Sequence, residues 1–161
     1  RTMPVQAHRW IDMGRAARAA YRSMLYALAG RQVPLWVPTH ADDLQLVATA
    51  SALSTVLDVA YVGYTRFGQS KTGRRDIRIE LFNGTALHRR ITGSIELDQH
   101  TERLAIDSAL GVLVEPGDVM RISWLALCRG NSDAVEIHHQ TDSEGVASSS
   151  LTFRGVRDDE F

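Results

Sequence analysis

The stretch Ile77–Leu87, IRIELFNGTAL, decides the fold class. Apolar and charged side chains alternate strictly over residues 77–81, and this period of two predicts a β-strand with one buried face. Asn83-Gly84 follows at once, and this pair is the strongest short-range signal for a hairpin turn. The alternation resumes over residues 91–97, with isoleucine and leucine on one parity. The stretch therefore predicts a β-hairpin inside a β-rich protein.

Further strands are predicted on both sides of this hairpin. The segment Val119–Gly130, VMRISWLALCRG, has apolar residues on both parities, which predicts a central strand covered on both faces, with Trp124 buried. Shorter strands are expected at 33–37 between two prolines, at 44–46, within 53–64, from 135 onwards and around 151–153. Strands from about 33 to 156 at hairpin-like spacing predict a β-sandwich or partly open barrel.

One amphipathic helix is predicted near the N-terminal end, at about residues 14–29. Its apolar positions recur at helical spacing and form one face. Arg15, Arg18 and Arg22 lie on the polar side, as a solvated face, an anion-binding stripe or a contact with a neighbouring subunit. We expect a subunit contact or a solvated face. The chain is thus expected to be mainly β with one helix, as a single domain over residues 1–161.

Composition narrows the function classes. The 161 residues carry 18 basic and 19 acidic side chains, for a formal net charge of −1. Such a balance gives no general attraction to nucleic acid or to an anionic membrane. No apolar run approaches the ~20 residues that span a bilayer. A single cysteine, Cys128, excludes an intramolecular disulfide and a four-cysteine metal site within one chain.

A polar segment at residues 65–76, TRFGQSKTGRRD, separates two predicted strands. Segments of this length without secondary structure are usually functional or disordered. Its cations allow either a weak, salt-dependent contact with phosphate or ordering against a partner subunit, and we favour the partner. The cations of this segment are Arg66, Lys71, Arg74 and Arg75.

Two clusters of polar residues deserve comparison with metal and acid–base sites. His138 and His139 lie beside Asp133 and Glu136, but neighbours on a strand point to opposite faces, so both histidines cannot bind one metal from a regular strand. His40 precedes Asp42 and Asp43, in a sequence that is equally typical of a polar turn.

Nucleophile candidates are also weak. Cys128 falls on an apolar strand face and is expected to be buried and inert. Ser148-Ser149-Ser150 lacks the nucleophile-elbow motif, and the chain holds no phosphate-binding or dinucleotide-binding loop. We therefore expect no catalytic residues, no cofactor and no metal.

Several segments together resemble a known family. A tryptophan-bearing strand, His8-Arg9-Trp10, leads into the helix, and Gly30-Arg31 and the Pro-Leu-Trp-Val-Pro run at 34–38 follow. This order, and the closing segments 119–129, 132–137 and 151–156, resemble distal tail and baseplate proteins at the tail tip of long-tailed bacteriophages. No part of the resemblance is a catalytic motif.

The resemblance implies a β-sandwich subunit of the virion, made in the cytoplasm of a bacterial host. It would form a ring or collar of three or six copies that joins the tail tube to the hub or fibres. Its partners would be copies of itself and other tail proteins, with DNA only as transient content of the channel and no membrane. The interface residues expected are Arg15, Arg18, Arg22, Arg66, Lys71, Arg74 and Arg75.

A second function remains open: a β-sandwich module that binds carbohydrate or a receptor. Sugar platforms need exposed aromatic rings, so exposure of both Trp10 and Trp36 on one concave face would favour it.

Overall fold

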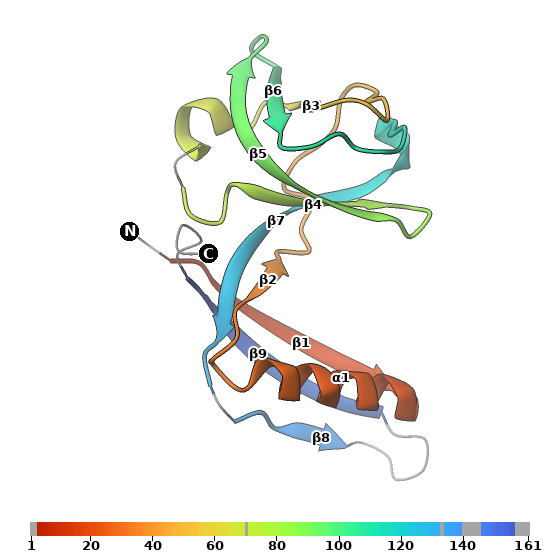
Figure 1. Ribbon diagram of the computed structural model, residues 1–161, viewed down its shortest axis with the longest axis vertical. Helices are drawn as coiled ribbons and strands as arrows, with labels where there is room; N and C mark the ends of the chain where they lie inside the picture. Colours follow the sequence, from red (N-terminus) through yellow and green to blue (C-terminus); the bar gives the residue numbers. More distant parts are fainter. Residues whose placement is uncertain (1–2, 70, 133, 140–145, 157–161) are drawn as a thin grey trace. The chain divides into compact units, whose positions relative to one another are not determined.

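The structure is a computed structural model that describes residues 3–69, 71–132, 134–139 and 146–156. It is mainly β: nine strands form an open antiparallel sheet, in the order β1-β9-β7-β4-β5-β6-β3, with β2 paired to β7 and β8 to β9 (Figure 1). The chain divides into two compact units, residues 1–37 with 127–161 and residues 38–126. The expectation of a single domain stays a prediction.

The first unit pairs the two ends of the chain. β1 (Val5–Met13) runs antiparallel to β9 (Val146–Gly155) in one unbroken register from Val5↔Arg154 to Met13↔Val146. β8 (Ile137–His139) pairs with the first half of β9, and the last residues of β7 pair with its second half. β2 (Leu35–Pro38) pairs with β7.

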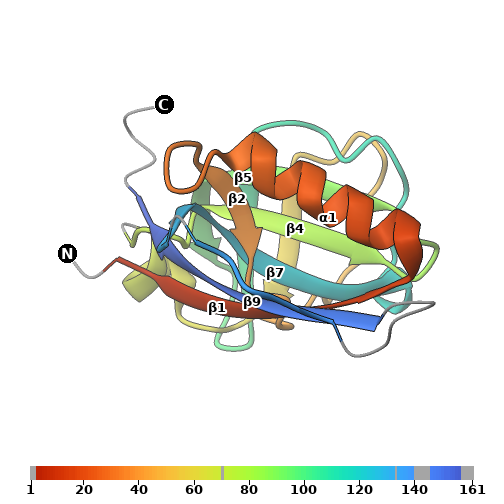
Figure 2. The same cartoon turned by 90° about the horizontal axis from the view of Figure 1, so that it is seen from below.

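The helix α1 (Gly14–Leu28) follows β1 directly, and Figure 2 shows it alongside the strands of its unit. Gly14 has φ 87°, a left-handed conformation that a glycine adopts without strain, and it turns the strand into the helix. Tyr21 is the buried residue of α1, and its ring lies 5.7 Å from that of Trp10. Trp10 also meets Phe153, with ring centroids 5.9 Å apart. An aromatic cluster therefore fastens α1 to one face of β1 and β9.

The second unit contains the predicted hairpin. β4 (Asp76–Leu81) pairs with β5 (Ala86–Glu96), and Gly84 at φ 88° makes the turn between them. β6 (Thr101–Ile106) joins β5 to β3 (Val56–Ala60), and β4 pairs on its other side with β7 (Val119–Gly130). A π-helical turn, η1 (Tyr64–Gly68), and a 3-10 turn, η2 (Pro116–Asp118), lie in the connections.

The segment before β3 links the two ends of this part of the sheet. Leu44 forms a bridge with Ile122 of β7, and Leu46 forms one with Val59 of β3. Their side chains belong to one apolar core with Ile77, Ile79, Leu104 and Trp124. The unit thus has a core of its own, enclosed by β-structure from five strands and this linking segment.

Most of the predicted elements are confirmed. The helix, the hairpin at Asn83-Gly84 and the buried central strand with Trp124 at 6% exposure are present. The residues 44–46 form isolated bridges in place of a strand. The helix, predicted at about residues 14–29, ends at Leu28, because Ala29 has a left-handed φ of 46°. In the part of the chain that the structure describes, every helix is too short or too polar to cross a bilayer.

Candidate functional site

The three predicted interface arginines of the helix lie together on α1. Arg15 and Arg22 are exposed, and Arg18 is half-buried with its Nε donating a hydrogen bond to the carbonyl of Gly14 at 3.4 Å. Their spacing of three and four residues places them on one stripe of the helix surface. The structure therefore brings these three together, as the sequence indicates.

The segment 65–76 differs from the structureless loop that its composition predicts. It begins with the turn η1, in which the amide of Gln69 donates to the carbonyl of Tyr64 at 3.2 Å. Glu102 on β6 holds this turn: its carboxylate accepts backbone hydrogen bonds from Val62, Tyr64 and Thr65 at 3.0, 3.1 and 2.8 Å. These hydrogen bonds attach the first residues of the segment to its own unit, and a contact of the segment with a partner subunit stays a prediction.

Glu102 is fully buried, yet its ionised form is favoured. Burial alone would raise the pKa of this carboxyl, but the hydrogen bonds from Thr65, Val62 and Tyr64 outweigh burial and hold the pKa below its usual value. Glu102 was not among the predicted site residues. The sequence pattern could have identified it, because Glu102 alternates in step with Leu104 and Ile106, which places a carboxylate on the buried face of β6.

The four cations of this segment have different surroundings. Arg66 forms a bidentate pair with Glu96, at 2.7 Å from Nε and 3.0 Å from Nη2. The Arg74 guanidinium lies 5.4 Å from the ring centroid of Trp124. Arg75 is half-buried, and Lys71 is exposed. Lys71 is thus the cation of this group that is most available to another molecule.

The stretch Pro38–Asp43, considered above as an acid–base cluster, is a turn fastened to β7. Asp43 accepts hydrogen bonds from the Thr39 hydroxyl and, at 3.0 Å, from the amide of Trp124. The carbonyls of His40 and Ala41 accept hydrogen bonds from side chains of β7, Arg121 at 2.9 Å and Ser123 at 2.6 Å. The carboxylate of Asp43 therefore has a structural role in this turn.

The remaining candidate groups show no catalytic arrangement among the described residues. Cys128 has no exposed surface, and burial raises its pKa to about 11. Glu136 and His138 lie 3.6 Å apart on the surface, and Asp133 falls outside the described residues. Within the described ranges, no three His, Cys, Asp or Glu side chains gather closely enough to hold a metal ion.

The sheet ends in a long strand whose outer face carries Val5, Ala7, Ile11 and Met13, with the charged Arg9 in the middle of the row. Among the described strands β1 pairs with β9 alone, so its other edge presents unpaired backbone groups. Trp10 turns toward α1, where its ring meets Tyr21, and the odd-numbered residues of β1 are all exposed. Val5, Ile11 and Met13 are 64, 61 and 73% exposed. An edge of this length with apolar side chains on its open face is a typical association surface.

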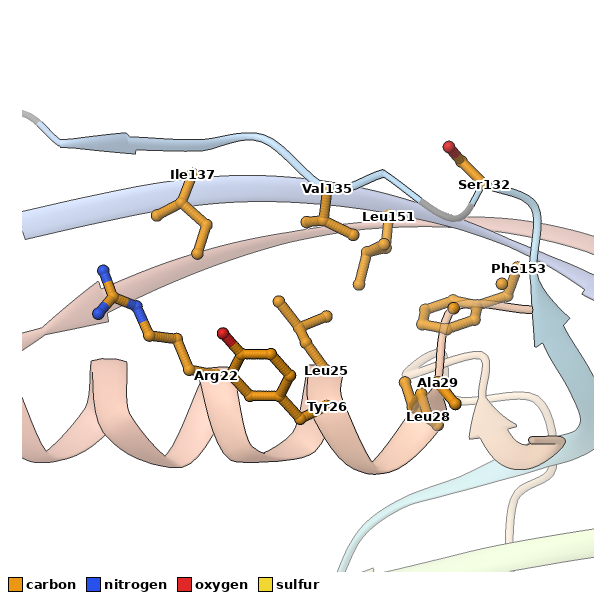
Figure 3. Close-up of a pocket in the computed structure, with 12 residues that line it drawn as sticks. Arg22, Leu25, Tyr26, Leu28, Ala29, Ser132, Val135, Ile137, Leu151 and Phe153 are labelled. Atoms are coloured by element: carbon orange, nitrogen blue, oxygen red, sulfur yellow. The ribbon is translucent and has the colours of Figure 1, made fainter. Parts of the chain in front are cut away.

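A pocket of about 420 Å³ opens between α1 and the strands β8 and β9 (Figure 3). Leu25 and Leu28 of the helix face Leu151, Phe153 and the segment before β8. Arg22 is the charged residue of the lining. The sequence pattern missed this pocket, because the same apolar spacing on α1 predicts a fully packed face, whereas Leu25 and Leu28 are only half-buried.

Comparison of the chain with protein-family profiles and with curated protein sequences finds no match.

Proposed function

We propose that this chain is a structural protein of a bacteriophage tail tip or baseplate, which acts by assembly and not by catalysis. It forms a ring or collar of three or six copies between the tail tube and the hub or fibres, in the virion, after synthesis in the host cytoplasm. The sequence resemblance supplies the identity of the assembly. The free edge of β1 and its exposed apolar side chains supply the physical support for association.

The energy available at this surface is substantial. Burying one exposed valine, isoleucine or methionine side chain is worth about 1.5–3 kcal/mol, and Val5, Ile11 and Met13 form one row on β1. Strand addition at the free edge would add backbone hydrogen bonds, which give affinity with little demand on side-chain identity. A subunit that meets several different neighbours needs such a surface.

The proposal includes the finer fold. A partly open barrel for residues 38–126 is supported by the bridges of Leu44 and Leu46, which link β7 to β3 at the two ends of the five-strand run. A small barrel or sandwich with its own core is a rigid body on which loops and edges can serve as contacts.

The binding-module alternative has weaker support. Trp36 is 42% exposed, but Trp10 is half-buried and its ring packs against Tyr21 and Phe153. A carbohydrate platform that uses both tryptophans would require the aromatic cluster to open. We therefore place this function second.

The test is the mass of the purified protein by light scattering at two salt concentrations, with negative-stain images, alone and mixed with tail-tube and hub proteins. Wild type is expected to form rings, alone or with those partners. Ile11→Lys with Met13→Lys should abolish the rings, because two charges on the row oppose its burial. Leu53→Lys, at an 86% exposed site in the other unit, is the matched control. A monomer under every condition would contradict the proposal.

A further inference from the structure

The pocket between α1, β8 and β9 has the size and chemistry of a binding site. Its volume of about 420 Å³ falls in the range of roughly 300–1,000 Å³ usual for ligand pockets. Its wall is mostly aliphatic and aromatic, from Leu25, Leu151 and Phe153 with their neighbours. An occupant must therefore present a large apolar group.

The pocket has one positive charge at its rim, the guanidinium of Arg22. Figure 3 shows the Arg22 side chain extending from α1 toward Ile137, at one end of the apolar lining. No residue in the described ranges forms an ion pair with Arg22, whereas Arg66, Arg90 and Arg103 each bind a carboxylate. Arg18 and Arg15 continue the positive stripe along the helix, away from the pocket. The occupant should thus carry carboxylates next to its apolar group.

We infer that this pocket binds the segment Asp158-Asp159-Glu160-Phe161 of a neighbouring copy of the chain. The segment supplies both features: a phenylalanine for the apolar wall and three adjacent acids for the arginine stripe. Its occupancy by a neighbour rests on the proposed function, because it requires copies to assemble.

The order of the charge and the apolar group agrees between the segment and the pocket. Glu160 immediately precedes Phe161 in the sequence, and Arg22 lies at one end of the apolar lining. With Phe161 in the pocket, Glu160 is placed to pair with Arg22.

The described part of β9 runs past the pocket. Leu151 and Phe153 line it, whereas beyond it Gly155 donates to the Pro4 carbonyl at 2.6 Å and Val156 to the Leu127 carbonyl at 2.8 Å. Binding in a neighbouring copy and binding within one chain differ in their consequence: truncation after Val156 removes rings in the first case and leaves them intact in the second.

The first test is binding of a labelled peptide, Val-Arg-Asp-Asp-Glu-Phe, to the full-length protein by fluorescence anisotropy. Replacing the peptide's phenylalanine by alanine, or its acids by Asn-Asn-Gln, should each weaken binding roughly tenfold or more. Arg22→Glu should weaken the acidic peptide by a similar factor and leave the Asn-Asn-Gln peptide unchanged. Leu53→Glu with Gln99→Glu, at two exposed sites in the other unit, changes the net charge by the same two units as Arg22→Glu and serves as the control.

The second test separates this inference from the proposed function. A chain truncated after Val156 and an Arg22→Glu variant should both lose rings under conditions where the wild type forms them. Adding excess peptide to wild-type rings should also dissociate them. Rings that survive all three changes would overturn the inference and leave the proposed function standing. If the protein bound the peptide specifically but never formed rings, the proposed function would be overturned, and so would the claim that a neighbouring copy supplies the segment. The specificity of the pocket for the segment would still be confirmed.

Discussion

The ring of Tyr64 stacks on the indole of Trp124, with centroids 5.5 Å apart and planes inclined by 21°. Tyr64 belongs to the turn η1, and Trp124 lies in the central strand β7. The guanidinium of Arg74 lies 5.4 Å from the same indole. This stack joins the polar segment 65–76 to the core of its unit, and it explains why a segment with so many polar residues has a definite conformation.

The stack should contribute measurably to stability. Trp124→Ala is expected to lower the free energy of unfolding by about 3–5 kcal/mol, since it removes a large buried ring and leaves a cavity. Trp124→Phe should cost less, because a ring remains beside Tyr64. Arg74→Ala should cost about 0.5–1 kcal/mol, the usual value of an exposed cation–π contact. Urea denaturation followed by circular dichroism measures all three, and equal effects of the two Trp124 variants would contradict the stacked arrangement.

Glu102 should make the stability of the protein depend on pH in the acid range. The pKa of its carboxyl is lower in the folded protein than its ordinary value of 4.5, so ionisation stabilises the fold. That contribution is complete above pH 4.5 and is lost as the pH falls through the lower, folded pKa. Glu102→Gln should therefore reduce stability at pH 7 and flatten the loss below pH 4.5.

Urea titrations of the wild type and of Glu102→Gln between pH 3 and pH 7 test this expectation. Asp58, whose pKa is lowered by its hydrogen bond with Arg103, provides the matched control. Asp58→Asn removes an ion pair but leaves the three backbone amides at Glu102 satisfied. If Glu102→Gln retained the full acid dependence of the wild type, the role assigned to this carboxylate would be wrong.

Cys128 should be chemically inert in the folded protein. Its side chain has no exposed surface, and burial raises the pKa of its thiol to about 11. At pH 8 the native protein should react with a disulfide reagent only at the rate at which it opens, whereas protein in urea should react at once. Rapid stoichiometric labelling without denaturant would show that the thiol is accessible.

Charge reversal in the segment 65–76 separates an assembly role from a structural one. Lys71→Glu should leave the free energy of unfolding within about 0.5 kcal/mol, because Lys71 is exposed. Arg66→Glu should destabilise, since it sets a carboxylate against Glu96. If the segment contacts a neighbour, Lys71→Glu should reduce ring formation at low salt by light scattering. Unchanged assembly would remove Lys71 from the interface.

The sequence predicted local structure better than it predicted contacts. Alternation over 77–81 and the turn residues Asn83-Gly84 act within a few residues, so the hairpin could be derived directly. Other contacts join residues that lie 13 to 78 positions apart in the sequence. They are the bridges of Leu44 and Leu46 and the hydrogen bonds from three amides to Glu102. These contacts depend on which strands pair, and strand pairing cannot be derived from a single sequence.

The candidate sites show the same limit. The arginine stripe followed from helical spacing, and the structure places Arg15, Arg18 and Arg22 on α1 as expected. The pocket did not follow, because its wall combines Leu25 with Val135 and Leu151, which only the folded chain brings together. The exposure of the row on β1 could not be predicted either. Alternation of apolar residues shows that a strand has two faces, but it does not show which face is covered.

The register of β1 with β9 has a consequence for synthesis on the ribosome. Val5 pairs with Arg154, so residues 6–153 must be synthesised before this pair can form. Residues 38–126 are contiguous and can fold earlier. During that interval the exposed row of β1 and the Trp10 ring remain unpaired, and non-local pairing of this kind is slow. Nascent chains are therefore most exposed to aggregation in the interval before β9 emerges, and a chaperone that binds β1 in that interval should raise the yield of native protein.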